Sequence, residues 1–137
     1  MRSRAAAANL QWAVYRLATS VPSFEREQYL YLTTRGRKTK RPREIEIWFT
    51  QHESRFYVVA EYPTSHWVQN LRAHPEVQVR VAGKTLVASA RILSSQANAQ
   101  LQRAVQKLFD KKYGWSEGLV VELMPELGER ITAQPPG

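Results

Sequence analysis

Alternation of apolar and polar residues is the main pattern in the middle of the chain. The clearest case is 76–81, where Val77, Val79 and Val81 alternate with polar residues. Successive side chains of a strand point to opposite faces, so this pattern predicts a strand with one buried face. Similar alternation, or enrichment in Tyr, Thr, Val and Ile, predicts further strands at residues 28–34, 44–50, 55–60, 85–92 and 118–123.

Three segments instead have the period of a helix. In residues 5–18, Leu10, Ala13, Val14 and Leu17 recur at the spacing of one helix face. A short helix is predicted over 65–72, ending before Pro75. A long helix is predicted over 96–112, capped by one of two serines and carrying an apolar stripe; the residues concerned are Ser94, Ser95, Leu101, Ala104, Val105 and Leu108.

The connections between these elements are short. A polar turn at 51–54 is expected to join strands 44–50 and 55–60 in a hairpin, and Gly83 marks another turn. The expected fold is mainly β (α+β), a barrel or partly open barrel of about six largely antiparallel strands with three helices packed outside. The expected organisation is an N-terminal amphipathic helix over 1–20, the barrel domain over 21–130 and a frayed tail over 131–137.

Composition narrows the class of protein. The chain has 137 residues and 43% of them are hydrophobic, which fits one globular domain. It contains no cysteine, so disulfides, thiolate catalysis and iron–sulfur clusters are excluded. No apolar run approaches the roughly 18 residues of a membrane-spanning helix. A cytoplasmic location is the expectation.

The chain is strongly basic. Lys and Arg number 20 against 12 Asp and Glu, which gives a net charge of +8. Such a chain attracts polyanions such as nucleic acid, anionic lipid or a phosphorylated small molecule. The N-terminal helix has two interpretations: it packs on the domain, or it lies at the inner face of the cell membrane with Trp12 and Tyr15 among the headgroups.

Residues 35–43 form a basic loop between two predicted strands. Six of these nine residues are Lys or Arg and none is acidic. Gly36 is expected to adopt a positive φ that turns backbone N–H groups toward an anion, and Thr39 adds a hydroxyl donor. The loop therefore resembles a phosphate-binding site, with a solvated basic loop and a nucleic-acid patch as the alternatives.

Other chemistries find little support. The histidines, His52, His66 and His74, lack the spacing of a metal site, so no metal is expected. Glu44 and Glu46 share a strand face, but after the basic loop they are better explained by salt bridges than by acid–base catalysis. Rossmann, P-loop and nucleophile-elbow glycine patterns are absent from the sequence.

Three blocks of the sequence are similar to motifs of one protein family. The stretch Y-L-T-T-R-G-R-K-T-K-R-P-R at 31–43 is similar to the signature L-T-T-x-G-R-K-T-G-x-x-R. The second block is F-Y-V-V-A at 56–60, and the third, at 65–79, resembles the stretch W-x-x-N-L-x-A-N-P-x-V-x-V. Together the three blocks resemble the deazaflavin-dependent nitroreductase and quinone reductase family. The resemblance covers about residues 29–123 and implies a split β-barrel related to FMN-binding pyridoxamine-phosphate-oxidase barrels.

The resemblance also implies a cofactor and a reaction. Members use reduced coenzyme F420, so the expected activity is hydride transfer to a quinone, nitro compound or similar small acceptor. FMN on the same barrel, or a carrier without turnover, are the alternatives. The cofactor residues implied are Arg37, Lys38, Thr39 and Arg43 for phosphate or tail, Ile45, Ala60 and Glu61 around the ring, and Ser65, Trp67 and Asn70 at the short helix.

One residue departs from the family signature. Lys40 stands where the family usually has glycine, and a left-handed backbone there costs a lysine roughly 1 kcal/mol. The acceptor pocket is expected to be lined by Tyr57, His66, Tyr113 and Trp115, each of which has a purely structural alternative. The expected partners are a small electron acceptor and a second copy of the chain in a homodimer, and no nucleic acid.

Overall fold

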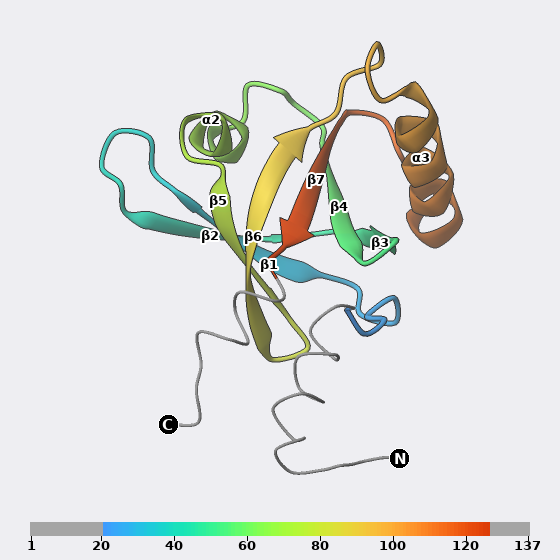
Figure 1. The fold of residues 1–137 in the computed structure, drawn as a ribbon, viewed down its shortest axis with the longest axis horizontal. Coiled ribbons are helices and arrows are strands. Elements are labelled where there is room, and N and C mark those ends of the chain that lie inside the picture. The colour runs from blue at the N-terminus through green and yellow to red at the C-terminus, as the bar shows by residue number, and fades with distance from the viewer. Residues whose placement is uncertain (1–20, 127–137) are drawn as a thin grey trace.

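One antiparallel sheet of seven strands forms the body of the protein (Figure 1). The computed structural model describes residues 21–126. The sheet order is β2-β1-β5-β6-β7-β4-β3, and every neighbouring pair is antiparallel. The strands are β1 Leu30–Arg35, β2 Pro42–Ile47, β3 Thr50–His52, β4 Arg55–Ala60, β5 Glu76–Val81, β6 Lys84–Ile92 and β7 Leu119–Pro125.

The strand predicted over 44–50 is wrong in its continuity, which is why the sheet has seven strands rather than six. The ladder between β1 and β2 ends where Leu30 pairs with Ile47. The chain then turns at Trp48 and Phe49, and the backbone of Phe49 bonds to the hydroxyl of Tyr113 instead of a neighbouring strand. The expected hairpin with 55–60 exists only for β3, whereas β2 pairs with β1.

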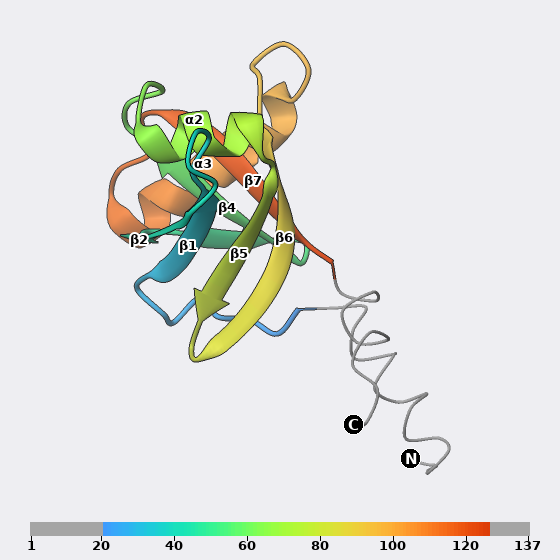
Figure 2. The same cartoon turned by 90° about the vertical axis from the view of Figure 1, so that its left-hand side faces the viewer.

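This break explains how the sheet curls. β2 and β3 are consecutive in sequence but occupy the two opposite edges of the sheet. The connection at Trp48 and Phe49 therefore brings the two edges of the sheet together without pairing β2 to β3. The result is the partly open barrel predicted from the sequence (Figures 1 and 2).

The barrel interior holds the main core. Alternate residues of β5 are buried, as the alternation predicted, and they pack with the inward side chains of the other strands. Burying one such Val, Leu or Phe side chain stabilises the fold by about 1.5–3 kcal/mol. Buried members of this cluster include Leu30, Leu32, Phe49, Phe56, Val58, Val77, Val79, Val81, Val121 and Leu123.

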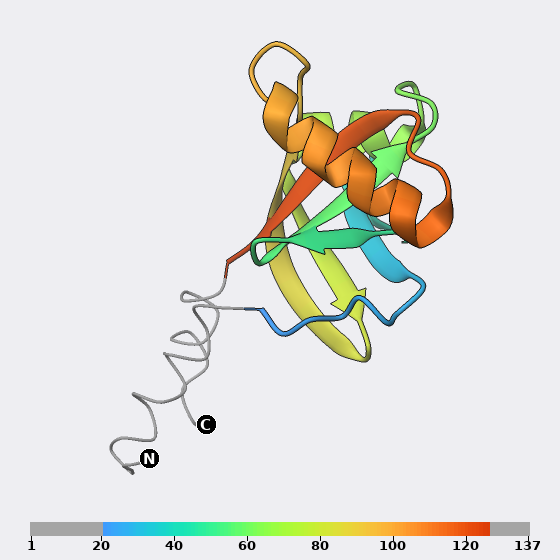
Figure 3. The same ribbon diagram turned by 90° about the vertical axis from the view of Figure 1, so that its right-hand side faces the viewer.

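A second layer covers the outside of β4 and β7. Helix α3, Ala99–Tyr113, lies across these two strands (Figure 3) and buries Val105 and Phe109 against Tyr57 and Val120. β4 is consequently buried on both faces, in accord with its unbroken run F-Y-V-V-A. The predicted stripe is thus corrected, because Phe109 is buried and Leu108 only half-buried.

The helix boundaries differ slightly from the prediction. α3 begins at Ala99 with Asn98, and not a serine, as its N-cap. The hydroxyl of Ser94 accepts a hydrogen bond from Ala97 N in the turn before the helix. α3 ends at Gly114, whose φ of 73° is left-handed. Helix α2, His66–Ala73, matches the predicted short helix and packs over the end of the sheet near β1.

The predicted N-terminal helix and the frayed tail lie outside the described residues. Within residues 21–126 neither helix is long and apolar enough to cross a membrane.

Candidate functional site

The basic loop is a tight turn between β1 and β2. Two backbone bonds close it, from Gly36 N to Arg41 O at 2.8 Å and from Lys40 N to Gly36 O at 2.8 Å. A Cβ on Gly36 would lie 2.8 Å from Thr39 Oγ1 and 3.3 Å from Arg41 O. Close packing of the turn therefore favours glycine here; φ of Gly36 is not positive, which corrects the prediction for this residue.

The left-handed residue of the turn is Lys40. Its φ is 62°, in the region where a side chain costs roughly 1–2 kcal/mol relative to the right-handed backbone. The family signature has glycine at this position, so the geometry demanded by the turn is retained although the residue is not. The loop keeps its shape at the cost of local backbone strain.

Asn70 fastens the loop to α2. Its Oδ1 accepts hydrogen bonds from Arg37 N at 3.1 Å and from Arg37 Nη1 at 2.9 Å, while its Nδ2 donates to Thr34 Oγ1 at 3.3 Å. Asn70 is buried, with 4% of its surface exposed. All three bonds lie within the protein, so the Asn70 amide positions Arg37.

The loop and α2 together enclose a cavity of about 770 Å³, called here the cofactor cavity. His66 belongs to it, and its Nδ1 lies 3.4 Å from Arg37 Nη2. The lining residues are Gly36, Arg37, Lys38, Thr39, Arg43, Ile45, Ser65, His66, Trp67 and Asn70. Eight of the ten cofactor residues implied by the resemblance are thus brought together, and His66 joins them.

The chemistry of this lining suits an anionic group. Three cations, Arg37, Lys38 and Arg43, face the cavity and no acidic residue lines it. α2 begins at the same wall, where its N-terminal N–H groups and dipole favour negative charge. A phosphate-bearing cofactor therefore fits these residues, which would hold the phosphate through charge-assisted hydrogen bonds.

Ala60 and Glu61 do not line the cofactor cavity. Ala60 is buried at the end of β4, and Glu61 lies on a neighbouring cleft of about 530 Å³. This second space, called here the aromatic cleft, bridges the gap between β2 and β4. It is lined by Tyr29, Glu46, Ile47, Trp48, Val59, Glu61, Phe109 and Trp115.

Tyr57 lies in the core and not on the cofactor cavity. It is 1% exposed, and its hydroxyl donates to Glu122 Oε2 at 2.8 Å. Arg55 and Arg91 also bond to Glu122, at 3.0 Å each. Burial and the adjacent carboxylate raise the pKa of Tyr57. Burial opposes ionisation of Glu122, but hydrogen bonds from Tyr57, Arg55 and Arg91 bring its pKa below the usual value.

Tyr113 bonds to the backbone at the break between β2 and β3. Its hydroxyl accepts a bond from Phe49 N at 3.0 Å and lies 2.8 Å from the carbonyl oxygens of Gln28 and Phe49. Burial raises the pKa of Tyr113 to about 12. Its ring stacks on Trp48 at 4.4 Å between centroids, so Tyr113 supports a wall of the aromatic cleft. Trp115 lines that cleft directly.

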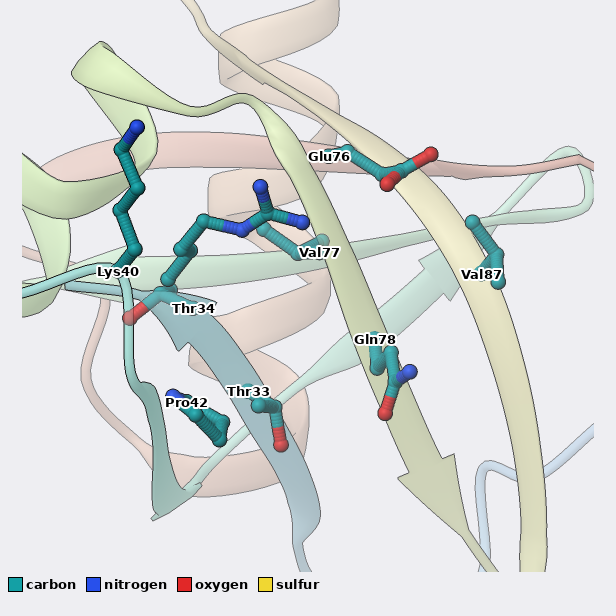
Figure 4. Close-up of a pocket in the computed structure, with 9 residues that line it drawn as sticks. Thr33, Thr34, Lys40, Pro42, Glu76, Val77, Gln78 and Val87 are labelled. Atoms are coloured by element: carbon teal, nitrogen blue, oxygen red, sulfur yellow. The ribbon is translucent and has the colours of Figure 1, made fainter. Parts of the chain in front are cut away.

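A third hollow, the outer groove, lies beside the basic loop on the outer face of the sheet. Figure 4 shows Lys40 and Glu76 on opposite sides of it, with Thr33 and Gln78 lower in the view. Its volume is about 400 Å³. Lys40 thus faces away from the cofactor cavity, which the sequence pattern did not indicate.

Two walls of the aromatic cleft, Glu61 and Trp115, are among the site residues expected from the sequence, whereas Trp48 and Glu46 are not. Trp48 falls within the predicted strand 44–50, and Glu46 is interpreted from the sequence as a salt-bridge residue. The sequence signal that could have found them is that Trp48 falls on the same strand face as Glu44 and Glu46, an unusual place for a large aromatic side chain; in the structure 36% of its surface is accessible. Across residues 21–126, no group of three or more His, Cys, Asp or Glu side chains is placed to hold a metal ion.

Solved structures of similar fold support the partly open barrel. A FAD-binding protein from Mesorhizobium loti aligns with a TM-score of 0.60 and 15% identity, covering 88% of this chain and 91% of that one. A protein from Listeria innocua described as a pyridoxamine 5′-phosphate oxidase aligns at 0.55 with 15% identity, covering 85% and 94%. An F420-H2-dependent reductase aligns at 0.52 with 22% identity, covering 76% and 99%. The fold is the split β-barrel that the sequence resemblance implied.

The family match decides between the cofactors left open by the loop. The model of the F420H(2)-dependent quinone reductase family matches residues 8–116, which is most of the chain. This match favours coenzyme F420 over FMN and an enzyme over a carrier. The chain therefore belongs to the F420H(2)-dependent quinone reductase family and is a deazaflavin-dependent oxidoreductase that uses coenzyme F420.

Proposed function

We propose that this protein transfers a hydride from reduced coenzyme F420 to a quinone, nitro compound or similar small acceptor. The observation that carries the proposal is the cofactor cavity, whose cations and helix N-terminus converge on one space. Reduced coenzyme F420 supplies the hydride when bound, and one proton completes the reduction of a quinone to its hydroquinone.

The residues that line the cofactor cavity have different proposed roles. Arg37, Lys38, Arg43 and the hydroxyl of Thr39 hold the cofactor phosphate, and Ser65 lies at the start of α2 beside them. Ile45 and Trp67 provide the apolar wall of the same cavity. Among the described residues that line the cavity, His66 is the candidate acid–base side chain, and it is proposed to supply the proton that completes the reduction.

Ala60 and Glu61 keep a lesser role in the proposal. Ala60 ends β4 and Glu61 follows it on the aromatic cleft, so neither is placed to hold the phosphate, and Glu61 would be available to the ring side of the site. Tyr57 has no place in the proposed reaction because its hydroxyl is buried on Glu122. Tyr113 contributes by supporting Trp48.

The test is a titration with oxidised coenzyme F420, followed by its fluorescence. Wild type is expected to bind, and Arg37→Ala together with Lys38→Ala is expected to weaken binding by about 1.5–3 kcal/mol per charged hydrogen bond lost. Lys84→Ala is the matched control, since Lys84 lies on β6 and does not line the cofactor cavity. Equal affinities of the double variant and the control would overturn the phosphate assignment.

Turnover is then measured as oxidation of reduced coenzyme F420 with menadione or a nitroarene as acceptor. Oxidation that depends on the acceptor and is lost in the Arg37→Ala, Lys38→Ala variant supports the proposal. Binding without oxidation of the cofactor by either acceptor would contradict the proposed acceptor class.

The protein is further proposed to form a homodimer. A solved neighbour is described as a domain-swapped dimer, with 20% identity, a TM-score of 0.53 and coverage of 70% of this chain and 79% of that one. Light scattering on the purified full chain tests this, and a monomer mass at all concentrations would overturn it.

Nucleic acid remains the rival ligand of the basic loop. Six phosphate contacts would give a log–log salt slope near −5, far steeper than a small ligand.

A further inference from the structure

The aromatic cleft and the cofactor cavity are lined by the same parts of the chain. β2 contributes Arg43 and Ile45 to the cofactor cavity, and its end and the following residue contribute Glu46, Ile47 and Trp48 to the aromatic cleft. After β4, Glu61 lines the cleft and Ser65 lines the cavity. The two spaces therefore share the same two stretches of chain.

The walls of the cleft are held in place before any ligand arrives. Trp48 is 36% exposed, yet its ring is stacked on Tyr113 at 4.4 Å with 6° between the planes, and it meets Trp115 edge-on at 6.3 Å. Tyr113 is in turn fixed by its hydroxyl contacts with Phe49. Ordered aromatic walls lose little conformational entropy on binding and suit a planar ring.

The charge of the cleft is opposite to that of the cofactor cavity. The described residues that line it include two glutamates, Glu46 and Glu61, and no Lys or Arg. Both glutamates are exposed. Within residues 21–126 neither forms an ion pair. Two carboxylates without an ion pair among the described residues thus lie beside the aromatic wall that Trp48 and Trp115 form.

We propose that the aromatic cleft is the acceptor site and that Glu46 and Glu61 select planar aromatic acceptors that are uncharged or cationic over anionic ones. This inference rests on the proposed function. One carboxylate about 6 Å from an anionic substituent in water disfavours binding by roughly threefold, so the two together act by about tenfold. A cationic ring gains from the carboxylates and from the tryptophan faces.

The experiment compares 1,4-naphthoquinone with its anionic 2-sulfonate. The sulfonate also changes the reduction potential of the ring, so the quantity measured is the ratio of kcat/KM for the two acceptors, compared between wild type and variants. In Glu46→Gln combined with Glu61→Gln, this ratio is expected to shift about threefold to tenfold toward the sulfonate. Glu44→Gln is the matched control, because Glu44 lies on β2 and pairs with Arg80 outside the cleft.

A second measurement needs no turnover. Both quinones are titrated into the protein without cofactor, and quenching of tryptophan fluorescence gives their dissociation constants. Wild type is expected to bind the neutral quinone more tightly, with the difference reduced in the double variant and in high salt, where the Debye length falls to about 3 Å at 1 M.

The two arms separate the possible failures. If cofactor binds but neither quinone is reduced, the proposed acceptor class fails, and the quenching titration still decides the selectivity of the cleft. If the ratio and the two dissociation constants are unchanged within twofold in the double variant, the cleft does not select by charge. Loss of quenching in Trp115→Ala would support the location, and full retention would contradict it.

Discussion

The carboxamide oxygen of Asn70 accepts two hydrogen bonds from Arg37, one from the backbone N–H at 3.1 Å and one from the guanidinium Nη1 at 2.9 Å. A residue on α2 thereby fixes both the course of the basic loop and the direction of one of its cations. The family resemblance implies that Asn70 touches the cofactor, whereas its polar atoms are all bonded within the protein. We therefore expect Asn70 to act through Arg37.

Asn70→Ala tests this role. It leaves Arg37 N and Thr34 without their partner, and each unsatisfied buried group costs about 1–3 kcal/mol. We expect lower stability and at least a fivefold weaker affinity for coenzyme F420. In a double-mutant cycle with Arg37→Ala, the losses in affinity should not add, since both variants remove the same interaction. Full additivity would show that Asn70 contacts the cofactor by itself. Arg72→Ala, exposed on the same helix, is the control.

Lys40→Gly is expected to stabilise the protein. It relieves a left-handed backbone that costs roughly 1–2 kcal/mol. Glycine also loses more conformational entropy on folding, which offsets about 0.5–1 kcal/mol of that gain in stability. The net gain of about 0.5–1 kcal/mol is measurable by urea unfolding. Lys40→Ala removes the same charge without relieving φ, so it should bring no such gain. A gain equal to that of Lys40→Gly would assign the effect to charge.

Tyr57→Phe separates a structural from a catalytic tyrosine. The substitution removes the hydroxyl that donates to Glu122 at 2.8 Å and leaves the ring in the core. A hydrogen bond to a charged group contributes about 1.5–3 kcal/mol, so the free energy of unfolding should fall by that order. The kcat with reduced coenzyme F420 should stay within twofold of wild type at a temperature where both are folded. A loss of kcat by tenfold or more would return Tyr57 to the reaction.

Acid should remove the contribution of Glu122. Its pKa is held below the usual value by hydrogen bonds from Tyr57, Arg55 and Arg91, which outweigh the opposing effect of burial. A carboxyl whose pKa is depressed on folding stabilises the fold above its unfolded pKa, and this contribution is lost as pH falls through the folded pKa. The stabilisation is therefore present at neutral pH and declines below about pH 4.5.

The measurement is the difference in Tm between wild type and Glu122→Gln across pH 3–8. We expect the largest difference at neutral pH and a progressively smaller one below about pH 4.5. Glu44→Gln removes the exposed pair with Arg80, which contributes only about 0–1 kcal/mol, and should show little pH dependence. A difference for Glu122→Gln that stays constant down to pH 3 would contradict a depressed pKa.

Much of the fold could be predicted from short-range pattern. The alternation of Val77, Val79 and Val81 predicted a strand with one solvent-exposed face. The unbroken apolar run in β4 matches a strand that is buried on both faces. The signature in the basic loop located the cofactor cavity, and its glycine position anticipated the left-handed backbone now found at Lys40. These features depend on neighbouring residues, so a linear sequence records them.

Other features depend on contacts between distant parts of the chain. The sequence pattern predicts that Trp48 and Phe49 continue a strand. In the structure the strand breaks there, and Phe49 N donates its hydrogen bond to the hydroxyl of Tyr113, more than 60 residues away. Tyr57 reads as a candidate for catalysis until pairing of β4 with β7 places it opposite Glu122. Neither partner can be identified from local periodicity.

The sequence by itself determined which residues are basic, where the strands alternate and which turn requires an unusual backbone. Only the tertiary structure decided that the cations and the start of α2 share one cavity, and that Glu46 and Glu61 line one cleft with Trp48 and Trp115. The physical reason is the curling of the sheet. It brings the end of β2 to the end of β4 although these strands are not hydrogen-bonded neighbours, and residues from both strands line the aromatic cleft.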